Sequence, residues 1–212
     1  MPDTASLVLF MAATLALLIV PGPAVLYIVT RSIEQGRLAG LISTLGIALG
    51  AVVHVLFAAA GLSAMLMQSV VAFTVVKYFG AAYLLYLGIR TLTRKTEAAQ
   101  IKEVEQVKLS RIFMQGFVVN LLNPKTAVFF FAFLPQFVNP VGYPVALQII
   151  ILGIIFIVMA IISDSLYAFI AGGARKYIVG NLKLARFQKN FAGAIYIMLG
   201  LMTAFSSSGK SK

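Results

Sequence analysis

The chain has no cysteine and a single histidine, and both shortages restrict the chemistry that it can perform. Without cysteine there is no disulfide, no thiol nucleophile and no thiolate metal site. His54 and Asp164, the one acidic residue inside the long apolar runs, are too few for a metal centre or a two-aspartate protease. No glycine-rich phosphate-binding loop is present, which argues against direct use of ATP. We therefore predict a protein that is not an enzyme and that holds no cofactor or metal.

Charged residues are also scarce, at 11% of the chain, whereas 61% of the residues are hydrophobic. The apolar residues form long runs without charge, at residues 4–30, 38–76 and 126–163. A helix that crosses the hydrocarbon of a bilayer needs ~20 such residues. The sequence therefore predicts an all-α integral membrane protein.

Turn residues divide these runs into six predicted transmembrane helices, which use nearly the whole chain and leave no room for a soluble domain. We expect a single transmembrane domain over residues 1–212. The first run should remain in the mature protein, because no basic residue precedes it and Asp3 is acidic. The predicted spans are residues 6–30, 38–62, 69–89, 112–138, 146–171 and 190–206.

The net charge of +11 comes mostly from short loops, which argues for membrane topology and against nucleic-acid binding. Thirteen basic residues follow the first, third and fifth predicted spans, and only two lie on the other side, in the C-terminal tail. By the positive-inside rule, the three basic loops are cytoplasmic and both termini are outside. The thirteen are Arg31, Arg37, Arg90, Arg94, Lys95, Lys102, Lys108, Arg111, Arg175, Lys176, Lys183, Arg186 and Lys189.

Six spans divide into two halves of three, and an odd number makes the second half enter the membrane from the opposite side. Any internal repeat must then be inverted. We predict two inverted three-helix repeats, at about residues 1–92 and 111–206, joined by a cytoplasmic connector at about 93–110. Helices 1 and 4 are the broken ones.

Two predicted spans are interrupted by prolines, at Pro21-Gly22-Pro23 and at Asn123-Pro124-Lys125. A proline within a helix removes one backbone hydrogen bond and blocks another, and hydrocarbon has no water to replace them. Two such breaks at corresponding places in two halves indicate a transport site. We therefore predict a transporter whose substrate lies at the breaks. The predicted substrate-binding residues are Pro21, Gly22, Pro23, Asn120, Asn123, Pro124, Lys125 and Tyr167.

Two titratable residues are candidates for proton coupling. Asp164 lies deep in the fifth span, where a carboxylate costs ~2.5–3.5 kcal/mol, so it marks either a pathway or a structural ion pair with Lys125. Lys125 could instead hold a substrate carboxylate or extend to the membrane interface. His54 could titrate near neutral pH or simply form a hydrogen bond between helices.

The sequence resembles the LysE/RhtB family of bacterial amino-acid exporters over essentially its whole length. The residues that carry the resemblance are Val20-Pro21-Gly22-Pro23, Gly46 to His54 (GIALGAVVH), Lys77 to Gly88 (KYFGAAYLLYLG), Asn123-Pro124-Lys125 and Leu134-Pro135-Gln136-Phe137-Val138. An aspartate in the fifth span is also an expected feature of this family.

The resemblance implies a six-segment protein of the bacterial inner membrane that exports amino acids. Because uphill export needs an energy source, we expect the proton as coupling ion, and a homodimer is a possible assembly. The motifs are more similar to the threonine and homoserine branch than to the lysine-exporting branch, so we expect a neutral amino acid or homoserine lactone. The alternatives are export of a basic amino acid such as lysine, a passive small-solute channel, and an assembly partner without transport of its own.

Overall fold

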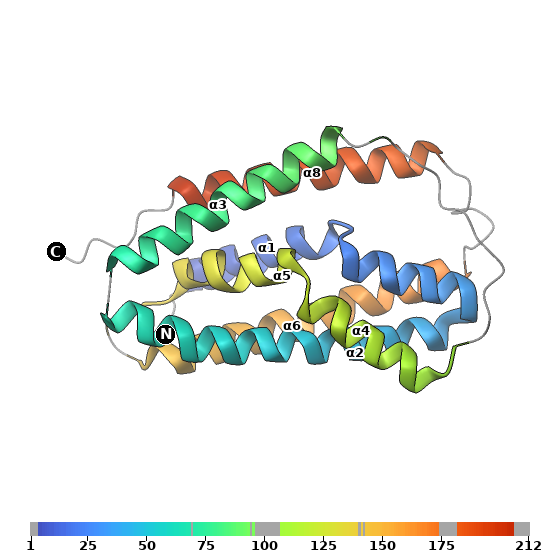
Figure 1. The fold of residues 1–212 in the computed structure, drawn as a ribbon, viewed down its shortest axis with the longest axis horizontal. Helices are drawn as coiled ribbons and strands as arrows, with labels where there is room; N and C mark the ends of the chain where they lie inside the picture. The colour runs from blue at the N-terminus through green and yellow to red at the C-terminus, as the bar shows by residue number, and fades with distance from the viewer. Residues whose placement is uncertain are drawn as a thin grey trace.

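The protein is an elongated bundle of helices (Figure 1). The computed structural model describes residues 4–68, 70–93, 95, 107–139, 141, 143–173 and 182–205, and no strand occurs among them. The predicted all-α class is therefore confirmed for these residues. Most of the predicted connector, and the tail from residue 206, lie outside the described part of the chain.

The first predicted span is broken where the prolines predict. Helix α1 covers Thr4–Ile19, and α2 begins at Pro23 and continues to Gln68. Pro23 takes the first position of its helix, where the missing N–H costs nothing. Within α2, Gly36 has φ 83° and ψ 179°, a left-handed backbone that glycine adopts readily. The chain reverses there, at the right-hand end of Figure 1, so that residues 23–35 and 37–68 run in opposite directions.

The second break separates α4 (Leu109–Leu121) from α5 (Pro124–Val128). The two sides are bent by 47°. After α5 the helix widens into a π turn, η1 (Phe129–Phe133), and then tightens into a 3-10 turn, η2 (Leu134–Phe137). The amide of Leu134 bonds to the carbonyl of Phe129, five residues back. Such π turns are rare and frequently lie at functional sites.

The remaining helices are α3 (Val70–Thr93), α6 (Val145–Gly173) and α8 (Leu182–Phe205). The main difference from the predicted ranges is α8, which begins at Leu182 and not near residue 190. Its first turns carry Lys183 and Arg186, both exposed, and these charges excluded the segment from the predicted span. Lysine and arginine are nevertheless good helix formers, so the charge ends the apolar run without ending the helix.

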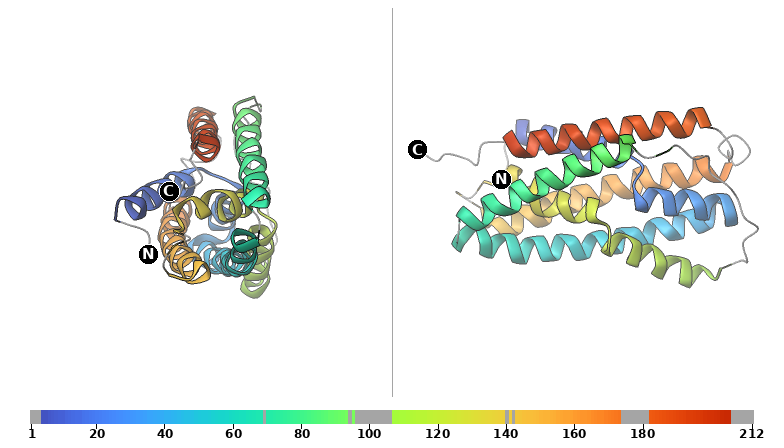
Figure 2. Two further views of the ribbon diagram at one scale, coloured as in Figure 1. Left: turned by 90° about the vertical axis from the view of Figure 1, so that its left-hand side faces the viewer. Right: turned by 45° about the horizontal axis from the view of Figure 1, so that its top comes forward.

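Helix α2 packs most extensively against α6 and α4, and α3 packs against α8 (Figure 2). Small residues allow the close approach. A Cβ atom on Gly46 would overlap the carbonyl oxygen of Phe113 in α4, and one on Gly88 would lie 2.6 Å from Ile197 Cγ1 in α8. Close packing of this kind is typical of helices in lipid.

The outer surface is strongly apolar. Phe57, Phe79 and Ile162 are 62%, 75% and 58% exposed. By length and composition, residues 23–61, which include the reversal at Gly36, contain an apolar stretch long enough to cross a membrane, residues 145–173 form a second, and the bent pair of α4 with residues 124–137 makes a third candidate. Large exposed apolar surface on such helices identifies a membrane protein.

Candidate functional site

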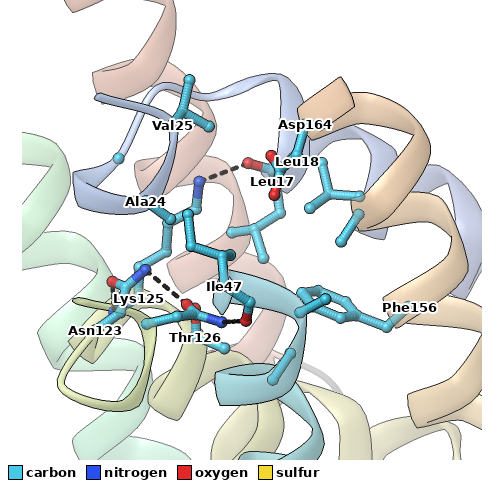
Figure 3. A pocket seen from close by; sticks show the side chains of 15 residues that line it. Leu17, Leu18, Ala24, Val25, Ile47, Asn123, Lys125, Thr126, Phe156 and Asp164 are labelled. Atoms are coloured by element: carbon cyan, nitrogen blue, oxygen red, sulfur yellow. Dashed lines mark hydrogen bonds between the residues drawn. The ribbon is translucent and has the colours of Figure 1, made fainter. Parts of the chain in front are cut away.

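The two breaks lie against each other in the centre of the bundle, and Lys125 joins them (Figure 3). Its ammonium donates hydrogen bonds to the backbone oxygens of Leu17 and Val20, both at 2.7 Å. Carbonyls at the end of a helix lack partners within the helix and carry partial negative charge. The Leu17 oxygen also accepts from the amide of Val20 at 3.2 Å, so the lysine of the second break adds a donor there and supplies one to Val20.

A third open carbonyl at the same place is bound from α6. The hydroxyl of Tyr167 donates to the oxygen of Ile19 at 2.7 Å. The ring of Tyr196 in α8 lies 5.8 Å from the Lys125 ammonium, within the range of a cation–π contact. Four helices thus converge on the first break.

The second break is organised by Asn120. Its side-chain amide donates to the oxygen of Ile47 in α2 at 2.7 Å, and its side-chain oxygen accepts from Thr126 at 2.8 Å and from Asn123 at 3.3 Å. The Asn123 side chain caps α5 by accepting from the amide of Lys125 at 3.1 Å. The side-chain amides of Asn120 and Asn123 therefore replace backbone hydrogen bonds that Pro124 prevents.

His54 supports the same break from α2. Its Nε2 atom lies 3.0 Å from the backbone oxygen of Asn120, and a carbonyl only accepts, so the ring donates. The ring also stacks on Phe130, with centroids 6.2 Å apart and planes inclined by 4°. His54 therefore binds the backbone at the second break but does not line the central cavity.

A cavity of about 40 Å³ lies between the breaks, enough for a few water molecules. Its walls combine polar groups from the breaks with apolar side chains from α1, α2 and α6. The lining residues are Leu17, Leu18, Gly22, Ala24, Val25, Ile47, Ala48, Ala51, Asn120, Asn123, Lys125, Thr126, Phe156, Ala160 and Asp164.

Asp164 reaches this cavity from α6 and is 4% exposed. Among the described residues it makes no hydrogen bond and no ion pair within 4.0 Å. Lys125, the structural partner that the sequence offers, donates its hydrogen bonds to the carbonyls of α1 but lies close enough to act electrostatically on the Asp164 carboxylate. A buried carboxylate without a hydrogen bond is costly, so this group is available to a cation or a proton.

The cavity also receives the first turn of the segment at residues 23–35. Pro23 has no N–H, and the next two residues, Ala24 and Val25, line the cavity. The first amides of a helix have no acceptor within it and form the positive end of the helix dipole. The cavity therefore lies beside the positive end of this helix at Ala24 and Val25 and contains the carboxylate of Asp164.

The predicted site residues divide into two groups. Gly22, Asn120, Asn123, Lys125 and Asp164 line the cavity, whereas the others shape or support the breaks. Pro23 and Pro124 are exposed and Pro21 is half-buried. Those in the second group are Pro21, Pro23, Pro124, His54 and Tyr167.

Sequence reasoning missed the residues that give the cavity its apolar side, above all Phe156 and Ala160. Both lie on α6 at intervals of four residues from Asp164, the spacing that places side chains on one helix face. Taken together with Asp164, this spacing predicts that Phe156 and Ala160 lie on the same side of the helix as the carboxylate. Thr126, which follows the Asn123-Pro124-Lys125 motif directly, was also missed.

Sequence reasoning also missed a polar cluster between the first segment of α2 and α4, at the end of the bundle where α2 reverses, which we call the basic end. The Gln115 side-chain oxygen in α4 accepts from Tyr27 at 3.1 Å and from Arg31 at 3.0 Å. Arg31 also forms an ion pair with Glu34 at 3.0 Å, and Tyr27 donates to the oxygen of Ile112 at 2.9 Å. The cluster joins the first segment of α2 to α4.

Comparison with known proteins gives the family. The model of the LysE type translocator family matches residues 15–207. An uncharacterized membrane protein of Bacillus subtilis, YrhP, is 31% identical over 95% of this chain and 99% of its own length. A homoserine/homoserine lactone efflux protein of Salmonella typhi is 32% identical over 87% of this chain and 88% of its own. A leucine efflux protein of Salmonella choleraesuis is 27% identical over 89% of each.

No solved structure matches the chain. The family match covers most of the sequence and includes both breaks, Asp164 and the helices that surround the cavity. The chain belongs to the LysE type translocator family.

Proposed function

We propose that this protein exports neutral amino acids across the bacterial inner membrane by proton-driven alternating access. The observation that carries the proposal is the central cavity, where a helix end and a lysine face a buried carboxylate that makes no hydrogen bond among the described residues. Named relatives export homoserine, homoserine lactone or leucine, which supports an amino-acid substrate.

The proposed architecture is six passes in two inverted repeats. The first repeat contains α1 with residues 23–35, then residues 37–68, then α3. The second contains α4 to η2, then α6, then α8. Two observations support this division: the equivalent elements pack on one another, the second segment of α2 on α6 and α3 on α8, and the two broken passes meet at Lys125. Such pairing is expected for repeats related by an axis in the membrane plane.

The proposed orientation places the basic end in the cytoplasm. The reversal within α2, the end of α3, the start of α4, the end of α6 and the start of α8 all lie toward the right of Figure 1, whereas the start of α1 and the end of α8 lie toward the left. The three segments rich in arginine and lysine follow or join these ends. The positive-inside rule then gives termini outside.

The cavity suits the two charges of an amino acid. In the proposed complex the substrate carboxylate lies at the amides of Ala24 and Val25, beside the ammonium of Lys125. Its α-ammonium pairs with Asp164. Lys125 uses two of its three protons on Leu17 and Val20, which leaves one for the substrate.

A neutral substrate fits better than a basic one. Among the described residues that line the cavity, only Lys125 and Asp164 are charged, and the α-ammonium occupies the one carboxylate. The second ammonium of lysine would then lie among Phe156, Ala160 and Ala51, where a buried unpaired charge is very unfavourable.

A carrier fits better than a passive channel. The cavity holds a few water molecules and is smaller than an amino acid, so that substrate entry requires the helices to move apart. Export against a gradient needs energy, and one charge crossing 100 mV supplies ~2.3 kcal/mol, roughly a fiftyfold gradient. We propose Asp164 as the group that carries the proton, with His54 as the second candidate.

Reconstituted vesicles test this function. Purified protein in vesicles with an imposed pH gradient should accumulate labelled leucine, homoserine or threonine, and preloaded substrate should accelerate uptake of label. Asp164→Asn should abolish accumulation at unchanged protein abundance, with Lys108→Met, an exposed site, as the control.

Each alternative gives a different result. Equal accumulation by the asparagine variant contradicts the proton role of Asp164. Flux without acceleration by preloaded substrate identifies a channel, accumulation of lysine identifies a basic substrate, and inert vesicles identify an assembly partner.

A further inference from the structure

We propose that Ala160 and Phe156 form the subsite for the substrate side chain and limit it to an unbranched or branched aliphatic chain of about leucine size. This inference rests on the proposed function, in which Asp164 holds the α-ammonium. It adds the residues that select one neutral amino acid over another.

The three residues form a single row on α6. Phe156, Ala160 and Asp164 follow one another at intervals of four, and each lines the cavity. They are 4%, 5% and 4% exposed. Four residues of α-helix rise ~6 Å, so Ala160 lies about one turn, and Phe156 about two turns, from the carboxylate. Figure 3 shows Asp164 and Phe156 extending from the same helix at different heights of the cavity.

A substrate anchored at Asp164 therefore directs its side chain toward Ala160. The methyl group of Ala160 is the smallest side chain that keeps the helix regular, and it leaves room where a larger residue would fill the cavity. Opposite it, α2 contributes two further small residues, Ala48 and Ala51. Leu18 of α1 completes an apolar surface without hydrogen-bonding groups. This part of the cavity suits an aliphatic chain.

Phe156 closes the far end of the row. Its ring packs against Phe129 and Phe130, with centroids 4.9 Å apart in both pairs. Phe129 and Phe130 are 1% and 0% exposed, and both belong to the π turn that follows the second break. A ring held between two buried rings cannot move aside without disturbing the core. A substrate longer than leucine, or an aromatic one, would therefore meet a fixed wall.

The size of the expected effect follows from the general behaviour of apolar pockets. One additional or missing methylene changes discrimination by roughly 10- to 200-fold. Ala160→Val adds two carbons at the middle of the row, so the preference for leucine over alanine should fall about ten- to hundredfold. Phe156→Ala removes the wall, so the preference for phenylalanine over leucine should rise.

The experiment is competition in counterflow, which needs no proton gradient. Vesicles loaded with one amino acid take up label while unlabelled glycine, alanine, valine, leucine or phenylalanine competes outside. Wild type, Ala160→Val and Phe156→Ala are compared with Ala12→Val, the same change at an exposed position of α1. In Ala160→Val the order of preference between alanine and leucine should reverse. In Ala12→Val the order should be that of the wild type.

The outcomes separate this subsite from the transport function itself. If the variants exchange substrate with the wild-type order of preference, the subsite is wrong and the proposed function stands. If wild type exchanges no amino acid, both are wrong. Should Ala160→Val fail to fold, Ala160→Gly and Phe156→Leu remain: a preference shifted toward larger side chains supports the subsite, and an unchanged preference overturns it.

Discussion

The ammonium of Lys125 lies 2.7 Å from the backbone oxygen of Val20, although 105 residues separate them in the sequence. This contact joins two proline breaks from opposite halves of the chain. Lys125 lies in the first turn of the helix after one break, and Val20 follows the helix before the other. The open backbone of each break therefore lies within protein, as a hydrocarbon environment requires.

Removing the ammonium should loosen the junction. Lys125→Met preserves most of the side-chain volume but leaves the oxygen of Val20 without a donor and the oxygen of Leu17 with only the Val20 amide. An orphaned buried group costs ~1–3 kcal/mol, and relief of a buried charge offsets part of the loss. We expect a net loss of about 2 kcal/mol of stability, measured by thermal unfolding in detergent. An unfolding temperature equal to that of Lys108→Met would contradict the capping role.

Asn120 should be more sensitive than its neighbour Thr126. Asn120→Ala removes bonds to Ile47, Asn123 and Thr126, whereas Thr126→Val removes one and keeps the shape. We expect losses of about 2–4 kcal/mol for the first and about 1 kcal/mol for the second. Thermal unfolding of the two variants side by side tests the order, and equal losses would show that Asn120 is not the organising residue.

Two glycines of α2 should respond in opposite ways. A Cβ atom on Gly46 would overlap the backbone oxygen of Phe113, while one on Gly61 would meet nothing within 4 Å. Gly46→Ala should separate α2 from α4 and cost about 1–3 kcal/mol or more. Gly61→Ala should be neutral or stabilising by up to about 1 kcal/mol, because alanine is the better helix former. Similar behaviour of both variants would contradict the close α2–α4 contact.

The polar cluster at the basic end should control access to the cavity. Gln115→Leu removes the hydrogen bond from Arg31 and one of the two acceptors that share the Tyr27 proton, which can still go to Ile112 of α4. At ~1 kcal/mol or somewhat more in total, the loss should favour opening by roughly five- to tenfold. A cysteine placed at Ala24 should then react that much faster with a thiol reagent applied from the basic side. An unchanged rate would mean that this cluster does not hold the end closed.

The sequence was informative about where the backbone crosses lipid and where it breaks. Runs without charge and the two proline motifs predict α1, α2, α4 and α5 closely, since lipid imposes the same requirement on every residue of a span. It was less informative about ends: α8 begins near Leu182 because charged residues continue a helix beyond its apolar part.

Pairing of side chains was the least predictable feature. The sequence offered Asp164 as one of several candidate partners for Lys125; the lysine donates its hydrogen bonds to two carbonyls and acts on Asp164 by charge alone. Backbone oxygens leave no trace in a sequence, so a partner of this kind is visible only in three dimensions. The bond from His54 to the oxygen of Asn120 escaped definite assignment for the same reason.

Substrate protection of a single cysteine tests the central cavity most directly, because the natural chain has no cysteine. Ala24 lines the cavity, whereas Leu26, two residues later, is 54% exposed on the outside of the bundle. In membrane vesicles, Ala24→Cys should react with a water-soluble thiol reagent, and the transported amino acid should slow the reaction. Leu26→Cys should not react in either condition. If Ala24→Cys is inert, or reacts at a rate that no amino acid changes, the two breaks do not enclose a substrate site.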